Sequence, residues 1–160
     1  MIKFLARTLI AALLGAATVL PAFAQTTVKD AWVRGTVAQQ KATGMFGQIT
    51  SATGGRIVSV SSPVAGVVEI HEMAMEGSTM RMRAVAALEL PAGKAVEFKP
   101  GGYHVMLMDL KQQMKTGDTV TVTLVIEGAG GKRETVEVKA PVRPLAGMPA
   151  GGMDHSGHKS

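Results

Sequence analysis

Residues 67–85 read VVEIHEMAMEGSTMRMRAV and predict a β-hairpin. On both sides of residues 76–79 (EGST), methionines recur at every second position. Side chains two positions apart in a strand lie on the same face, and a short loop containing glycine can join two antiparallel strands. With residues 76–79 as a four-residue loop, Met75 faces Met80 and Met73 faces Met82. We therefore expect the thioethers of both strands on one face.

Short segments of the same kind, separated by Gly- and Pro-rich turns, recur outward from this hairpin in both directions. Further strands are expected at 28–34, 45–50, 56–60, 88–90, 96–99, 103–110, 119–126 and 133–139. Residues 119–126 (TVTVTLVI) are the most regular, being rich in β-branched residues. About nine short strands, without a segment of sustained helical periodicity, predict an all-β sandwich or barrel with Greek-key connections.

The two ends of the chain differ in character from this domain, which spans residues 25–143. Residues 1–24 combine two basic residues, an apolar run over 9–20 and the sequence Ala-Phe-Ala at 22–24. This is the pattern of a secretory signal peptide, and its apolar run is too short for a permanent membrane anchor. We expect cleavage after Ala24 and export to the periplasm, with an uncleaved anchor as the alternative. Residues 144–160, rich in Gly and Pro, are expected to form a flexible tail.

Composition excludes several classes of function. The formal net charge is +5, and two of the basic residues belong to the signal peptide. The remaining basic residues are scattered singly and aromatic residues make up only 4% of the chain, which disfavours nucleic-acid binding. The chain contains no cysteine, so it has no disulfide framework and no thiolate ligand for blue copper. No nucleophile–base pair or paired carboxylates indicate an enzyme.

Histidine and methionine concentrate in residues 71–108, which hold two of the four histidines and six of the eleven methionines. Imidazole nitrogens and thioether sulfurs together suit Cu(I). Zinc prefers thiolate, imidazole and carboxylate ligands, and calcium or magnesium requires clustered oxygens that the sequence lacks. The alternative from the residues alone is a methionine-rich core without metal, because methionine fills irregular gaps in cores.

One spacing in this stretch is specific. His71 and Met82 are separated by ten residues, Met82 and His104 by twenty-one, and His104 and Met106 by one. This matches the H-x10-M-x21-H-x-M signature of the PCuAC family of periplasmic copper(I) chaperones, which the chain resembles. The words AWVR, HEMAM, MRMR and KPGGYHVMLMDL are also similar to that family. The resemblance covers residues 28–143.

The resemblance implies a cupredoxin-like β-sandwich that binds one Cu(I) through His71, Met82, His104 and Met106. It implies delivery of copper for assembly of the Cu(A) centre of cytochrome c oxidase. The partners would be a Sco-type thiol copper chaperone, the Cu(A) subunit, or both. We expect a non-enzymatic monomer without stable membrane insertion. A periplasmic copper storage or resistance protein and a metal-free structural β-domain are the alternatives.

Methionines outside these four positions have other expected roles. Packing, or a polarizable collar around the site, is expected for the methionines at 73, 75, 80 and 108, with ligation at a second site as the alternative. In the tail, an auxiliary copper site is the alternative to a solubilising end, and its candidate ligands are Met148, Met153, His155 and His158. Flexible imidazole-rich segments suit Cu(II).

Overall fold

The computed structural model describes residues 25–144. The predicted signal peptide (1–24) and the tail ligands Met148, Met153, His155 and His158 lie outside this range. The strands are β1 (Thr26–Arg34), β2 (Ala42–Ser51), β3 (Gly55–Ser61), β4 (Ala65–Glu76), β5 (Thr79–Val85), β6 (Leu88–Leu90), β7 (Ala95–Phe98), β8 (His104–Leu110), β9 (Thr119–Glu127) and β10 (Arg133–Arg143). Among the described residues, the only helical segment is the short 3-10 turn η1 (Ala129–Gly131). The all-β prediction is confirmed, and the ten strands within residues 25–144 correspond to the ten predicted ranges, one more than the total of about nine.

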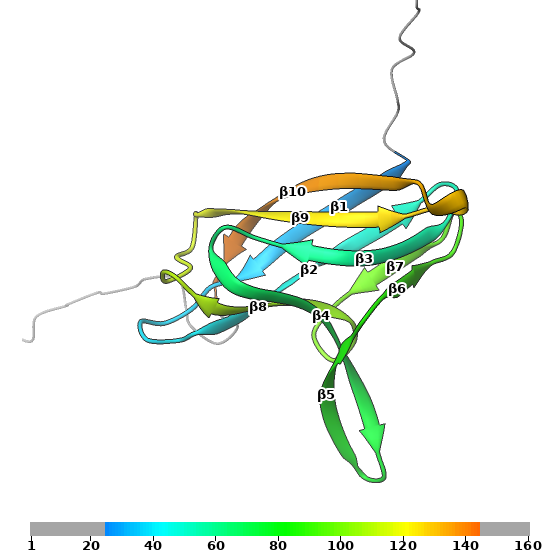
Figure 1. Ribbon diagram of the computed structural model, residues 1–160. Helices are drawn as coiled ribbons and strands as arrows, with labels where there is room; N and C mark the ends of the chain where they lie inside the picture. Colours follow the sequence, from blue (N-terminus) through cyan, green and yellow to red (C-terminus); the bar gives the residue numbers. More distant parts are fainter. Residues whose placement is uncertain (1–24, 145–160) are drawn as a thin grey trace, which may run out of the picture.

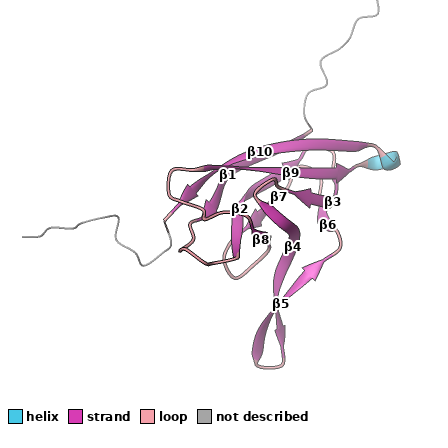
Figure 2. Cartoon of the chain, turned by 60° about the vertical axis from the view of Figure 1, so that its left-hand side comes forward, coloured by secondary structure: helices cyan, strands magenta, loops and turns pink. Residues whose placement is uncertain are grey.

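The strands form two layers joined along one seam (Figures 1 and 2). One layer has the order β5-β4-β8-β2-β1, with β7 also paired to β2, and the other has the order β10-β9-β3-β6. The seam is the parallel pair of β1 and β10, where Val33 lies opposite Val142. The hairpin of β4 and β5 projects beyond the body of the two layers (Figure 1).

The core lies between the layers and is built by alternate residues of their strands. In β9 the buried side chains are Val120, Val122, Leu124 and Ile126, which are all on one face. The first layer contributes Val33, Met45, Ile70, Val105 and Leu107. The opposite face of the first layer is therefore free to carry polar and metal-binding side chains.

The β4–β5 hairpin has the register that the alternation predicts. Met75 pairs with Met80, and Met73 pairs with Met82. The predicted four-residue loop is wrong, because Glu76 and Thr79 also form a cross-strand pair and the loop shrinks to two residues. Gly77 has φ of +64° there, a conformation that glycine adopts without steric cost and that two-residue hairpin loops require.

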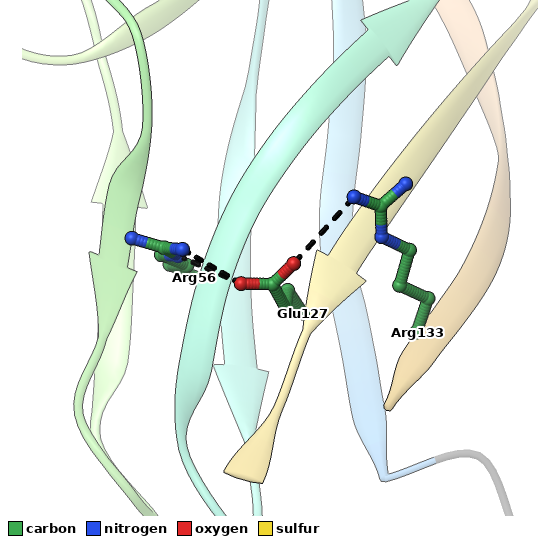
Figure 3. Close-up of polar contacts among 3 residues, drawn as sticks. All are labelled: Arg56, Glu127 and Arg133. Carbon is green, nitrogen blue, oxygen red and sulfur yellow. Dashed lines mark hydrogen bonds and ion pairs between the residues drawn. The ribbon is translucent and has the colours of Figure 1, made fainter. Parts of the chain in front are cut away.

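The second layer is linked at its end by an exposed ion-pair cluster (Figure 3). Glu127 of β9 accepts a hydrogen bond of 2.7 Å from Nη2 of Arg56 in β3, and it lies 3.6 Å from Nη2 of Arg133 in β10. The hydrogen bond from Arg56, reinforced by the charge of that residue, lowers the pKa of Glu127. Because solvent screens this cluster, it orients three strands but contributes little to stability.

Two methionines provide a matched test of this division into core and surface. Met45 is 1% exposed and Met75 is 62% exposed. Met45→Ala should lower the free energy of unfolding by about 2–5 kcal/mol, because it leaves a cavity in a packed core. Met75→Ala should change it by no more than about 0.5 kcal/mol. Urea unfolding of both variants checks this, and equal losses would contradict the assignment of faces.

Candidate metal centre

Strand pairing brings the four predicted ligands onto one face of the first layer, the face turned away from the core. His71 of β4 lies directly opposite His104 of β8. Met106 is two positions beyond His104, and Met82 pairs with Met73, which is two positions beyond His71. Opposite residues in a ladder point to the same side. The face is therefore shared by two imidazoles and at least three thioethers.

A hollow of about 270 Å³ opens on this face. Its lining includes the three predicted ligands Met82, His104 and Met106, and also Met73. His71 is not among its lining residues, but the His71 ring lies beside the His104 ring, with 6.0 Å between the two ring centroids. Two larger hollows, of about 440 and 630 Å³, contain neither histidine nor methionine. The smaller hollow is the candidate metal site because histidine and methionine side chains line it, not because of its size.

His104 is held rigidly and has one free nitrogen. Its side chain is buried, with 6% exposed, and Nδ1 lies 3.0 Å from the carbonyl oxygen of Gly102. Because a carbonyl can only accept, Nδ1 carries the proton and Nε2 keeps its lone pair. The carbonyl belongs to the turn before β8, where Gly102 N donates to Lys99 O at 3.0 Å.

The pKa of His104 is lowered, and the chief cause is burial of the ring. The positive charges of His71, when protonated, and of Arg34 lower it further, while the hydrogen bond to Gly102 acts in the opposite direction. Burial and the two positive charges favour the neutral imidazole, whereas the hydrogen bond to Gly102 favours the protonated one. Neutral imidazole is the form that binds a metal.

His71 presents the other ring nitrogen. Its Nε2 lies 2.8 Å from Oε2 of Glu69, and the ionised carboxylate can only accept, so Nε2 carries the proton. Its Nδ1 is buried and has no hydrogen-bond partner among residues 25–144. A buried polar atom without a partner is costly, and a metal bond would remove that cost. Glu69 thus orients His71 as carboxylates orient metal-binding histidines in known centres.

The separation of the two rings lies at the upper limit for one shared ion. A metal–imidazole bond is about 2 Å long and the ring centroid lies about 1 Å behind the nitrogen. Two imidazoles on one ion therefore have centroids at most about 6 Å apart, when they bind from opposite sides, and the 6.0 Å between His71 and His104 reaches that limit. No cluster of three or more His, Cys, Asp or Glu side chains that could hold a metal occurs within residues 25–144. The remaining donors here are thioethers, which select soft ions such as Cu(I).

Aromatic residues border the pocket on the β2 side. The Phe46 ring lies 6.3 Å from the His104 ring and 4.7 Å from the Trp32 ring. Arg34 lies over Phe46, with 5.2 Å between its guanidinium carbon and the ring centroid. This wall covers one side of His104 with apolar surface, which limits the access of water to a bound ion.

Two contributors to the site, Glu69 and Gly44, were not predicted from the sequence. Glu69 has a visible signal, since it stands two positions before His71 and thus shares its strand face. Met73, for which the sequence left packing and a collar around the site as alternatives, lines the pocket. No feature of the sequence indicates the role of Gly44. It lies opposite Met106, and an added Cβ there would come within 2.9 Å of the Phe46 ring.

The other methionines predicted as packing lie away from the pocket. Met75 and Met80 are exposed near the tip of the hairpin, so packing does not describe them. Met108 pairs with Val67 of β4 and Ala42 of β2 at the other end of the same face.

Comparison with known proteins identifies the family to which the chain belongs. Residues 26–142 match the family described as putative lipoprotein LpqE-like, and the chain belongs to this family. Over 91% of its length the chain is 31% identical to a putative lipoprotein, Lxx21020, from Leifsonia xyli subsp. xyli, of which the match covers 93%. Within residues 25–144, no helix is both long and apolar enough to cross a membrane.

Solved structures with the same fold include PCuAC domains, which agrees with the predicted cupredoxin-like sandwich. The apo PCuAC domain from PmoF1 aligns with a TM-score of 0.61 and 25% identity, covering 76% of this chain and 95% of that domain. The Cu(I) form of DR1885 from Deinococcus radiodurans aligns with a TM-score of 0.58 and 28% identity. That alignment covers 79% of this chain and 81% of DR1885.

The hydrogen bonds of the two histidines predict opposite tautomers in the metal-free protein at neutral pH. His104 should carry its proton on Nδ1 and His71 on Nε2. Long-range ¹H–¹⁵N spectra of the imidazoles report this directly. Glu69→Ala should abolish the preference of His71, whereas Glu72→Ala, on the other face of β4, should leave it unchanged. The same tautomer in both rings would contradict the assignment.

The lowered pKa of His104 predicts that the metal-free protein loses stability in mild acid. The unfolded side chain has a pKa of about 6.5, and the folded pKa lies below it. Between these values the unfolded chain binds more protons, so stability falls as pH decreases from about 7 towards the folded pKa. Urea unfolding with a chelator, between pH 7.5 and 5, should show a shallower decline in His104→Gln than in the unsubstituted protein. Parallel curves would exclude this contribution.

Proposed function

We propose that this protein is a copper chaperone that binds one Cu(I) through His71, Met82, His104 and Met106. The observation that carries the proposal is the cross-strand pair of histidines, which offers two unprotonated nitrogens on one face beside thioethers. The likeness to a solved Cu(I)-bound protein at 28% identity supports it.

The two kinds of ligand have different tasks. Imidazoles are the stronger donors, and both are anchored, one by Gly102 and the other by Glu69. Thioethers select the soft monovalent ion and carry no proton. Binding therefore depends on pH only through the histidines and the groups that orient them.

Release is favoured by the exposure of one ligand. Met82 is 48% exposed and stands on the hairpin that projects from the body of the protein (Figure 1). A client's ligand can replace this thioether without opening the core. All four ligands are neutral, so the ion is not trapped by a buried thiolate.

The proposed place of work is the periplasm, and the proposed destination is the Cu(A) centre of cytochrome c oxidase. The signal-peptide pattern of residues 1–24 and the names of the relatives, putative lipoproteins, support export. A Sco-type thiol chaperone or the Cu(A) subunit would accept the ion, since thiolates bind Cu(I) more strongly than thioethers. The protein would act as a monomer without catalysing a reaction. Transfer to an isolated Cu(A) domain, rather than retention, would separate delivery from storage.

An anaerobic Cu(I) competition titration tests the site. The unsubstituted protein should show one tight site, and Met106→Leu and His104→Ala should each weaken it at least tenfold, because each removes a ligand. Met108→Leu is the matched control, since Met108 shares the strand and face of Met106 but lies outside the proposed ligand set. Binding that is indifferent to the first two substitutions would leave a methionine-rich surface without a metal site.

A further inference from the structure

The tip of the β4–β5 hairpin exposes methionines that packing does not explain. Met75 is 62% exposed and Met80 is 47% exposed, whereas the core methionines Met45 and Met114 are each 1% exposed. Methionine normally fills gaps in cores. At this tip it is instead presented to solvent from both strands.

These side chains are arranged as a ladder. Met75 lies opposite Met80, and the next rung towards the body pairs Met73 with Met82. Cβ atoms of opposite residues are about 4.5–5.5 Å apart, and diagonal neighbours are about 7–8 Å apart. Flexible thioether side chains can converge over such distances. The rung of Met73 and Met82 also lines the pocket of the core site.

The opposite face of the hairpin carries charge, and it is balanced. Arg81 Nε lies 3.0 Å from Oε2 of Glu76, and Arg83 Nε lies 2.6 Å from Oε1 of Glu72. These two ion pairs leave no net charge near the ladder to repel a cation. Polar side chains are thus confined to one face and uncharged sulfurs to the other.

We propose that Met75 and Met80, together with Met73, form a second and weaker site for a monovalent soft cation, from which the core site is loaded. Thioethers are the ligands that select such ions, and the absence of imidazole from this set makes it weaker than the core site. Its role in loading rests on the proposed function, whereas ion binding at the tip does not.

The transfer from tip to core is a ligand exchange. Bonds from the ion to the sulfurs of Met75, Met80 and Met73 break as bonds to Met82, Met106 and the two imidazoles form. The ion keeps its oxidation state. No proton is released from the thioethers, and the free nitrogens of His71 and His104 accept the ion as they stand.

Silver nitrate in chloride-free buffer is the probe, because Ag(I) is a soft monovalent ion that needs no reductant. In the full chain labelled with ¹³C at the methionine ε-methyl groups, the first equivalent should shift the Met82 and Met106 signals. Further equivalents should shift those of Met75 and Met80. Separate signals for Met148 and Met153 keep any binding in the tail apart. Signals of Met75 and Met80 that stay unmoved at several equivalents would overturn the second site.

Two double variants separate the second site from the core site. Met75→Leu/Met80→Leu should keep the first step within about twofold but load the core several-fold more slowly under stopped flow, and Met108→Leu should load at the normal rate. An unchanged rate would overturn the loading role. His104→Ala/Met106→Leu should lose the first step and keep the shifts at Met75 and Met80. If the unsubstituted protein shows only the tip response, the proposed function fails and the second site stands.

Discussion

The pairing of β4 with β8 is the constraint on which the rest of the site depends. It places His71 opposite His104 and, one position away, Ile70 opposite Val105 in the core. Side chains alternate between faces, so a slip of one residue would bury the histidines and expose the core residues. The hydrophobic contacts of Ile70 and Val105 therefore fix the register that places His71 and His104 on the other face. Stability and site geometry have the same origin here.

Most of the fold and part of the site could be predicted from the sequence, for one physical reason. Strand periodicity is local: the spacing of Met73, Met75, Met80 and Met82 is enough to place them on one face, and the structure agrees. Contacts between distant segments are not local. The sequence does not reveal that Gly44 of β2, opposite Met106, leaves room for the Phe46 ring, or that Phe46 lies beside His104. The hairpin loop was predicted too long because glycine allows a tighter turn than its polar neighbours suggest.

The tautomers of the two histidines also depend on contacts that the sequence does not reveal. A spacing motif names His71 and His104 as equivalent, but their surroundings make them different. A backbone carbonyl holds one ring and leaves Nε2 free, whereas a carboxylate holds the other and leaves Nδ1 free. This distinction depends on which acceptor lies beside each ring. Glu69 was within reach of the alternation argument, while the carbonyl of Gly102 follows from the turn before β8.

Exposure differs along the face that carries the histidines and methionines. His104 is 6% exposed, Met82 is 48% exposed and Met75, near the tip, is 62% exposed. The imidazole of His104 is thus buried, whereas the thioethers of Met75, Met80 and Met82 face solvent on a hairpin that projects beyond the body of the two layers (Figure 2). A protein that stored an ion would gain by burying every ligand. Graded burial supports the proposed chaperone function, since exchange of a soft ion could begin at the exposed end while the imidazoles still retained it.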